Sequence, residues 1–344
     1  MIIKRLIIPK VKGFLGSDAL ARNDTLIFMH LQFQQAKNLI DKSRRILLTM
    51  HERMDGDDGG ALLAMGNQLE KMGKVVTYAI KKGVTANLAF LPGSKKIADD
   101  IDHKNFDLVI TFGCSTKDRT GSEKIMVLNV PFLNIDHHPD NSNFGTVNIV
   151  DAKKSSVAEL IYDFFLWNNW EITKDVATCL LTGIITDTGS FMHSNTQSST
   201  LKAAAELMRK GAQTHNIIKQ TYKSKSPQIL KAWGKAMENS YYDEKHKIIY
   251  SVMTEKDLGN FEKLPGGAFE GFVETLNTMP EAKFAMFLRQ DGGIIKGSLR
   301  SDTFKNIDVS KIAHIFGGGG HKLAAGFSVA GKLMKDEKGK WKVV

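Results

Sequence analysis

Short apolar runs alternate with amphipathic helical stretches over the first half of the chain. Residues 45–50 have the length and apolar character of a buried strand, and a helix is predicted from 59 to 72. Further strands are predicted at 74–80, 107–112 and 132–135. Strands that alternate with helices in this way are typical of a mostly parallel sheet flanked by helices. The first half is therefore predicted to be an α/β domain.

A helical period replaces this alternation beyond residue 150. Helices are predicted at 156–168, 174–185 and 197–210. Residues 213–240 contain no strand pattern and end in a helical stretch around Trp233. Strands return at 248–252, 282–288 and 294–299, followed by a short helix and four glycines. This last part is predicted to be a second, smaller α/β domain.

The patterns divide the chain into four parts. They are an N-terminal extension at 1–30, an α/β domain at 31–212, a helical linker at 213–240 and a smaller α/β domain at 241–344. The extension is interpreted as a strand or an arm. It lacks the apolar core of a signal peptide, and no apolar run approaches the ~18 residues of a membrane span. With only two cysteines, a disulfide scaffold is excluded and a cytoplasmic location is expected.

The charge balance narrows the class of partner. The chain has 47 Lys and Arg against 37 Asp and Glu, a formal net charge of +10. Such a surplus favours an anionic partner such as nucleic acid, nucleotide or phosphate. The basic residues are scattered along the sequence, however, so a solvated lysine-rich surface stays an alternative.

A Gly- and Asp-rich turn directly follows the predicted strand 45–50 and carries His51, Asp55 and Asp57. The carboxyl ends of parallel strands are where α/β sheets place ligand sites. Aspartate and histidine without cysteine suit Mn²⁺ or Mg²⁺ better than a structural zinc ion. The turn is therefore a candidate metal site. The alternative, a solvated Asp-Gly turn, leaves His51 unexplained.

Two further polar clusters follow apolar segments of the same domain. Asp136, His137 and His138 come directly after the strand 132–135. Adjacent histidines on a loop point in different directions, so one can bind metal while the other meets substrate, and Asp136 can orient a histidine from behind. Asp187 follows an apolar helix and lies among small residues. Each cluster alone could be an ordinary polar loop, but three in one α/β domain favour a metal site.

The second domain contains a candidate phosphate site. Four successive glycines without Cβ atoms can wrap an anion, and a helix that begins near His321 would add its dipole. The glycines are Gly317, Gly318, Gly319 and Gly320. Arg300 ends a predicted strand and can hold a phosphate through two hydrogen bonds. The alternatives are a flexible linker and a surface arginine.

Together these segments resemble the DHH phosphoesterases and their companion DHH-associated domain. The likeness of the first domain rests on His51-x-x-x-Asp55-x-Asp57, on Asp136-His137-His138 and on Thr186-Asp187-Thr188-Gly189. That of the second rests on Ser298-Leu299-Arg300-Ser301 and on the four glycines with His321. The similarity runs from about residue 42 to 329. It is greatest to the short two-domain nanoRNA hydrolases, which also remove phosphate from 3′-phosphoadenosine 5′-phosphate.

The resemblance implies two Mn²⁺ ions, with Mg²⁺ as the alternative. One ion would be held by His51 and Asp55. The ligands of the other would be Asp57, His137 and Asp187. His138 would lie near the scissile phosphate, supported by Asp136. The residues implied in substrate binding are Arg300, Ser301, Gly317, Gly318, Gly319, Gly320 and His321. The active site would lie between the domains, with the linker as hinge.

The implied function is metal-dependent hydrolysis of short oligonucleotides or linear dinucleotides to mononucleotides. The implied partners are short single-stranded RNA or DNA, dinucleotides and a nucleoside bisphosphate, with no membrane and with a homodimer as the expected assembly. Two alternatives stay open: a 3′-phosphatase acting on adenosine 3′,5′-bisphosphate, and a nucleotide-binding protein with weak catalysis.

One residue departs from the family pattern. The family places an aspartate that bridges the two ions at the end of the third strand, whereas this chain has Gly113. The glycine is either a natural loss of the bridge or an introduced substitution. Neither Ser115 nor Asp118 lies at the strand end. The chain is therefore expected to bind nucleotide but to hydrolyse it slowly, and Gly113→Asp is expected to raise Mn²⁺ affinity and kcat together.

Overall fold

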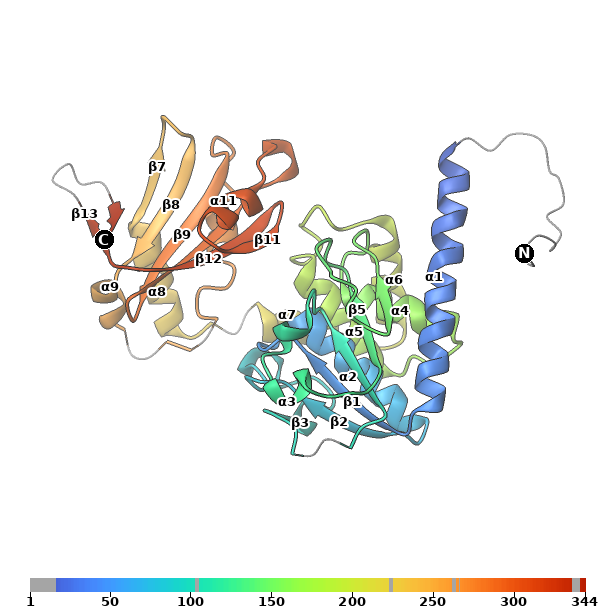
Figure 1. Cartoon of the computed structure of the whole chain (residues 1–344). Coiled ribbons are helices and arrows are strands. Elements are labelled where there is room, and N and C mark those ends of the chain that lie inside the picture. Colours follow the sequence, from blue (N-terminus) through green and yellow to red (C-terminus); the bar gives the residue numbers. More distant parts are fainter. Residues whose placement is uncertain (1–16, 103–104, 223–224, 262–263, 266, 336–340) are drawn as a thin grey trace. The chain divides into compact units, whose positions relative to one another are not determined.

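The computed structural model describes residues 17–344 apart from 103–104, 223–224, 262–263, 266 and 336–340. The described residues form two compact units (Figure 1). The first unit comprises the described residues up to Val84, together with Leu91–Asp187 and Lys202–Ala212. The second comprises Thr85–Phe90, Thr188–Leu201 and Gln213–Val344. Each unit is considered by itself, and the predicted domain boundaries stay predictions.

The first unit is built on a six-stranded sheet in the order β3-β2-β1-β4-β5-β6, in which every pair of neighbours is parallel. The strands are β1 (Arg45–Met50), β2 (Val75–Ala79), β3 (Ile97–Ala98), β4 (Leu108–Phe112), β5 (Phe132–Asp136) and β6 (Val147–Val150). Because β4 and β5 are buried along their whole length, both sheet faces are covered there. The prediction of a mostly parallel sheet is confirmed.

The strand order reverses between β1 and β4. Such a reversal sends the connections from the two strands to opposite faces of the sheet, which opens a ligand site at their carboxyl ends. Helix α2 (Gly56–Lys71) packs on β1 and β2, and α4 (Val157–Trp167) packs on β5. The other helices up to residue 212 are α1 (Ser17–Lys42), α3 (Glu123–Met126), α5 (Lys174–Asp187) and α6 (Ser198–Arg209), and the first residues of α6 are assigned to the second unit.

The N-terminal extension differs from the prediction over its described residues. Residues 17–30 begin helix α1 rather than forming a strand or an arm, and residues 1–16 lie outside the described residues. The later turns of α1 bury Phe33, Ala36 and Ile40, spaced three and four residues apart along one face. Phe33 meets Phe164 of α4 edge to face, with ring centroids 5.2 Å apart. This apolar stripe anchors α1 to the first unit.

The second unit contains a six-stranded mixed sheet in the order β11-β12-β10-β9-β8-β7. Only β8 and β9 pair in parallel. The strands are β7 (Ser240–Asp243), β8 (Ile248–Met253), β9 (Phe284–Asp291), β10 (Ile294–Arg300), β11 (Gly319–His321) and β12 (Ala324–Ala330), with a separate hairpin of β13 (Leu333–Lys335) and β14 (Trp341–Val343). The predicted smaller α/β domain is confirmed.

The predicted linker at 213–240 holds two helices, and the second belongs to a core. The helices after α6 are α7 (Thr214–Thr221), α8 (Pro227–Glu238), α9 (Glu255–Gly259), α10 (Phe272–Leu276) and α11 (Val309–Ile315). Helix α8 buries Ile229, Ala232 and Ala236 in one cluster with Phe272 and Phe287. Residues 227–238 are therefore part of the folded second unit.

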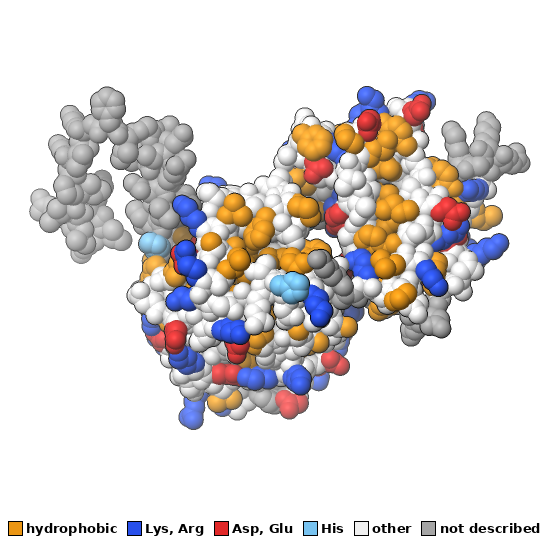
Figure 2. All heavy atoms as spheres, turned by 180° about the vertical axis from the view of Figure 1, so that it is seen from behind, with side chains coloured by type: hydrophobic (Ala, Val, Ile, Leu, Met, Phe, Trp, Pro, Cys, Tyr) orange, Lys and Arg blue, Asp and Glu red, His pale blue; other side chains and the backbone are white. Residues whose placement is uncertain are grey.

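Surface charge and hydropathy add two observations. Within the described residues, no helix combines the length and apolar character needed to cross a membrane. On the face shown in Figure 2, Lys and Arg side chains are spread among acidic ones rather than gathered into one block. The net positive charge therefore does not mark a single binding patch on this face.

Candidate active site

The polar residues of the first unit gather at the carboxyl ends of three neighbouring strands. His51 directly follows β1, Gly113 follows β4, and the pair His137 and His138 follows β5. Parallel strands bring these positions to one edge of the sheet, next to the reversal in strand order. Asp187 reaches this edge as the last residue of α5.

The first group consists of His51, Asp55 and Asp58, whose ligand atoms lie within 4.8 Å of one another. His51 Nε2 is 3.0 Å from an Oδ2 atom of each aspartate. Asp55 also caps helix α2, because its side chain accepts a hydrogen bond from the Asp58 backbone N–H at 2.9 Å. Burial lowers the pKa of His51, but its hydrogen bonds to the carboxylates of Asp55 and Asp58 outweigh this effect and raise that pKa to about 10.

The second group consists of Asp57, His137 and Asp187. His137 Nε2 lies 3.9 Å from Asp57 Oδ2 and 3.7 Å from Asp187 Oδ2. Asp57 is buried and accepts hydrogen bonds from the backbone N–H groups of Val157 at 2.7 Å and Ala158 at 2.8 Å. These N–H groups open helix α4, so Asp57 is held between the starts of two helices.

The two groups hold more carboxylates than the histidines can balance. Burial and the nearby charges of Asp187 and Asp58 raise the pKa of Asp57 well above its usual value. Burial, with Asp55 and Asp58, raises the pKa of Asp187 to about 7. Carboxylates crowded in this way are stabilised by a cation, because its charge removes their mutual repulsion. These acidic and histidine groups can therefore hold a metal ion.

Within the described part of the chain, Cys114 is the cysteine beside these strand ends, and it is buried. Burial, with the charges of Asp58 and Asp136, raises the pKa of its thiol well above the usual value. A protonated thiol is a poor metal ligand. The donors available here are therefore carboxylate oxygens and imidazole nitrogens.

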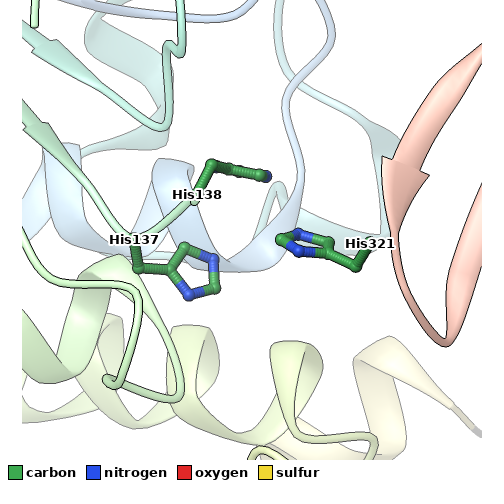
Figure 3. A group of neighbouring side chains, drawn as sticks. All are labelled: His137, His138 and His321. Atoms are coloured by element: carbon green, nitrogen blue, oxygen red, sulfur yellow. The ribbon is translucent and has the colours of Figure 1, made fainter. Parts of the chain in front are cut away.

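Asp136 supports the two histidines that follow it. It is fully buried, and its Oδ1 accepts the backbone N–H groups of His137 at 2.7 Å and His138 at 3.1 Å. His138 Nδ1 donates to the same oxygen at 2.6 Å. Asn141 donates to the other carboxylate oxygen. Figure 3 shows both histidines leaving the loop after β5, and their rings stand edge to face at 64°.

Sequence reasoning missed Asp58. The first group has three members, and the third is the aspartate that directly follows Asp57. The signal was the doubled aspartate at the start of α2, which spacing alone could not separate from an ordinary acidic first turn of a helix.

In the second unit, Arg300 is the last residue of β10 and Ser301 follows it. Arg300 Nε donates to Glu274 Oε1 at 2.7 Å, and Nη1 donates to the Leu299 carbonyl at 2.9 Å. Ser301 Oγ donates to the Lys283 carbonyl. These bonds use two of the five N–H donors of the guanidinium and orient it.

The glycine segment is built differently from the expectation. No helix begins near His321; that residue ends strand β11, and helix α11 lies before the glycines. Gly317 and Gly318 donate to carbonyls of α11 and thereby end it. The segment therefore faces the negative end of a helix dipole, and the predicted dipole support for a phosphate is wrong.

Comparison with known proteins places the chain in a family. A family model described as "DHH family, N-terminal domain" matches residues 45–184, and one described as "DHHA1 domain" matches residues 245–338. The chain belongs to the DHH family. The first match contains both groups of acidic and histidine residues, except for Asp187, and the second contains Arg300 and the glycine segment.

Two curated relatives are similar over most of the chain. Both are described as "Bifunctional oligoribonuclease and PAP phosphatase NrnA". The protein from Thermus thermophilus is 28% identical over 290 residues, which cover 83% of this chain and 84% of that protein. The protein from Bacillus subtilis is 28% identical over 299 residues, covering 83% and 89%.

One solved structure is similar to this chain over most of its length. The crystal structure of an exopolyphosphatase-related protein from Bacteroides fragilis matches with a TM-score of 0.81 and 25% identity. The match covers 86% of this chain and 90% of that one. The fold of this chain is therefore similar to that of the Bacteroides fragilis protein over most of its length.

Proposed function

We propose that this chain is a metal-dependent phosphodiesterase that hydrolyses short oligonucleotides or linear dinucleotides to mononucleotides. The observation that carries the proposal is the pair of carboxylate and histidine groups at one edge of the parallel sheet, built around His51 and His137. The two relatives described as oligoribonucleases support the substrate class. Short substrates are also consistent with the absence of one large basic patch on the face in Figure 2.

The residues fit two divalent ions. His51 and Asp55 would hold one ion, and Asp57, His137 and Asp187 the other. Oxygen and imidazole donors without a thiolate suit Mn²⁺, with Mg²⁺ as the alternative. When bound, such ions lower the pKa of a coordinated water and neutralise charge on the attacked phosphate.

The surrounding residues hold these side chains in place before substrate arrives. Asp57 is fixed by the first N–H groups of α4, and Asp55 by its cap on α2. His138, oriented by Asp136, would donate a hydrogen bond from Nε2 to the substrate phosphate or to the leaving oxygen. Preorganised donors of this kind lower the barrier because they need no rearrangement during the reaction.

Substrate binding is assigned to the second unit. The guanidinium of Arg300, already oriented by Glu274, can pair with a phosphate through its remaining N–H donors. Ser301, His321 and the glycines Gly317, Gly318, Gly319 and Gly320 would complete the phosphate contacts. Support comes from the position of all these residues within one matched domain.

A second activity is favoured by the printed description of both relatives, which are named as PAP phosphatases as well. A terminal 3′-phosphate and an internal phosphodiester present the same phosphorus centre to the same ligands. The chain would then also release phosphate from adenosine 3′,5′-bisphosphate.

The deciding experiment measures product formation from an RNA dinucleotide, a DNA dinucleotide, a 24-nucleotide RNA and adenosine 3′,5′-bisphosphate, each with Mn²⁺, Mg²⁺ or EDTA. We expect Mn²⁺-dependent turnover, fastest on dinucleotides. Asp187→Asn is the matched control against a contaminating nuclease. Absence of turnover on all four substrates, with Asp187→Asn indistinguishable from the unaltered chain, would refute the proposed function.

A further inference from the structure

Position 113 is not an empty gap at the end of β4. A Cβ atom placed on Gly113 would overlap the carboxylate of Asp58, from the first turn of α2. The space that a side chain at 113 would fill is therefore taken by a carboxylate from a different element. The backbone of Gly113 has φ +58°, and its N–H donates to the Ile135 carbonyl at 3.0 Å, which continues the pairing of β4 with β5.

Asp58 is placed unusually for a surface helix acid. Only 2% of the residue is exposed, and Oδ2 lies 3.0 Å from His51 Nε2. The other oxygen, Oδ1, is buried and has no hydrogen-bond partner among the residues that the structure describes. A buried carboxylate oxygen without a partner costs about 1–3 kcal/mol, more when charged, so its retention points to a ligand. An acid that merely favoured the start of α2 would serve equally well on the exposed side of the helix.

The Asp58 carboxylate adjoins both groups of the site. It is a member of the first group with His51 and Asp55, and it directly follows Asp57 of the second group in the first turn of α2. A Cβ atom on Gly113 would lie 1.7 Å from its Oδ2 and 2.2 Å from its Oδ1, so both oxygens lie where a side chain at 113 would begin. A carboxylate in this place, with one oxygen unpaired among the described residues, has the position required of a shared ligand.

We infer that Asp58 replaces the carboxylate that is missing at position 113, offering one oxygen to the ion of the first group and the other to the ion of the second. The chain thus retains a carboxylate between its ion sites, but this carboxylate comes from the first turn of helix α2 and not from the end of strand β4. This inference rests on the proposed function for the presence of two ions, but it concerns only the ligand.

This replacement reverses two expectations drawn from the sequence. The chain is expected to be a competent enzyme rather than a slow one. Gly113→Asp is expected to weaken Mn²⁺ binding rather than improve it, because the new Cβ meets the Asp58 carboxylate and two acids would compete for one space. The left-handed backbone at 113 adds strain, although aspartate tolerates it better than most residues do.

The test compares the unaltered chain with Asp58→Ala, Gly113→Asp and the double variant Asp58→Ala/Gly113→Asp. Asp118→Ala is the control, since Asp118 is an exposed acid close to position 113 in sequence. Mn²⁺ binding is measured without substrate, by calorimetry and by electron paramagnetic resonance, which reports both free Mn²⁺ and coupling between two bound ions. Thermal unfolding in EDTA shows whether each variant folds.

For Asp58→Ala we expect at least tenfold weaker Mn²⁺ binding and loss of the coupling signal, with the unfolding temperature in EDTA unchanged or higher. Removing even a residue that only hydrogen-bonds to a metal ligand typically lowers metal affinity or activity about 10–100-fold. The double variant should regain binding and coupling, because the carboxylate returns to the strand end with its space cleared. Gly113→Asp alone should bind more weakly than the unaltered chain, and Asp118→Ala should match it.

Three outcomes would overturn the inference: Asp58→Ala binding Mn²⁺ as the unaltered chain does, the double variant binding no better than Asp58→Ala, or the unaltered chain binding no Mn²⁺. Hydrolysis is measured separately. If Mn²⁺ binding depends on Asp58 but none of the four substrates is turned over, the proposed function fails while the ligand assignment stands. If turnover occurs and Asp58→Ala retains Mn²⁺ binding, the ligand assignment of Asp58 fails while the proposed function stands.

Discussion

The Oδ1 atom of Asp136 holds the ring of His138 through a 2.6 Å hydrogen bond from Nδ1 while accepting that residue's own backbone N–H at 3.1 Å. The carboxylate therefore sets both the loop conformation and the ring orientation of His138. It also holds a proton on Nδ1, and although burial lowers the pKa of the ring, the hydrogen bond to Asp136 raises it to about 9, so Nε2 carries a proton as well near neutral pH. The other ring nitrogen is left with its direction fixed by the fold.

Loss of this support should affect turnover more than binding. For Asp136→Asn we expect kcat on a dinucleotide to fall about 10–100-fold with little change in KM, because the imidazole loses its fixed orientation. Steady-state kinetics at matched Mn²⁺ measures the split. Asp140→Asn is the nearby control. Equal losses in kcat for His138→Ala and for the double variant with Asp136→Asn would show that Asp136 acts through His138.

The Asp57→Ala and Asp187→Ala variants should differ in the stability of the folded protein, although both residues are proposed metal ligands. Asp57→Ala removes the acceptor for two N–H groups at the start of α4, and such a cap typically contributes about 0.5–2 kcal/mol. Asp187 lies at the end of α5, where a carboxylate opposes the helix dipole. In EDTA, Asp57→Ala should therefore unfold at a lower temperature than Asp187→Ala.

Both variants should lose Mn²⁺-dependent hydrolysis. Thermal unfolding in EDTA and dinucleotide turnover with Mn²⁺ are measured on the same samples. Turnover by either variant at the rate of the unaltered chain would contradict its assignment as a ligand, and equal unfolding temperatures would contradict the capping role of Asp57.

The EDTA-treated protein should lose stability as pH rises from about 5 to 9. Burial and neighbouring carboxylates raise the pKa of Asp187 to about 7, so the folded state holds a proton that the unfolded state has released. Burial lowers the pKa values of His51 and His138, but their carboxylate partners raise them to about 10 and about 9. The sign is the same for an acid and a base: a raised folded pKa favours folding at low pH.

Unfolding temperatures across this pH range, with and without Mn²⁺, measure the effect. Mn²⁺ should raise the unfolding temperature more at pH 8.5 than at pH 5.5, because the metal competes with protons for the same side chains. Asp187→Asn should flatten the slope in EDTA. A slope of opposite sign between pH 5 and 9 would mean that these groups are not protonated in the folded metal-free site.

Arg300 should contribute to substrate binding rather than to chemistry. Arg300→Ala is expected to raise KM for a dinucleotide about 10- to 150-fold, the cost of losing a charge-assisted hydrogen bond of about 1.5–3 kcal/mol. His321→Ala should act in the same direction. Lys296→Ala is the control, since Lys296 lies on β10 four residues away and pairs with Asp291. Unchanged KM in both Arg300→Ala and His321→Ala would remove the second unit from substrate binding.

Alanine substitutions at Gly318 and Gly319 can distinguish a structural role of the glycine segment from a role in substrate binding. A Cβ on Gly318 would overlap backbone of Gly326 and Phe327, whereas one on Gly319 would meet only His314, 3.7 Å away. Gly318→Ala should therefore lower the unfolding temperature, at a cost of about 1–3 kcal/mol. Gly319→Ala should fold normally and raise KM. If KM does not change in the folded Gly319→Ala variant, the segment serves only the pairing of β11 with β12.

The local pattern of apolar and polar residues determined much of the secondary structure and of the candidate site. The strands predicted at 45–50, 74–80, 107–112 and 132–135 and the helix predicted at 59–72 were correct within a few residues, because alternation and helical period depend on neighbours in sequence. The same holds for the two groups around His51 and His137, since parallel strands necessarily bring their carboxyl ends to one edge. Together with the motif spacing, this was sufficient for the family. The short strands β3 and β6 at the sheet edges and the strands β11 and β12 were not predicted.

Only the tertiary structure decided how distant segments share space. Helix α8 enters a core because its apolar face meets β9 and α10, which no local pattern reveals. The glycine segment follows a helix rather than starting one, since pairing with β12 extends it as a strand. Above all, Gly113 alone indicated a lost ligand. The sequence could not show that the carboxylate of Asp58, 55 positions earlier, occupies its space, because overlap between two side-chain positions is a property of packing.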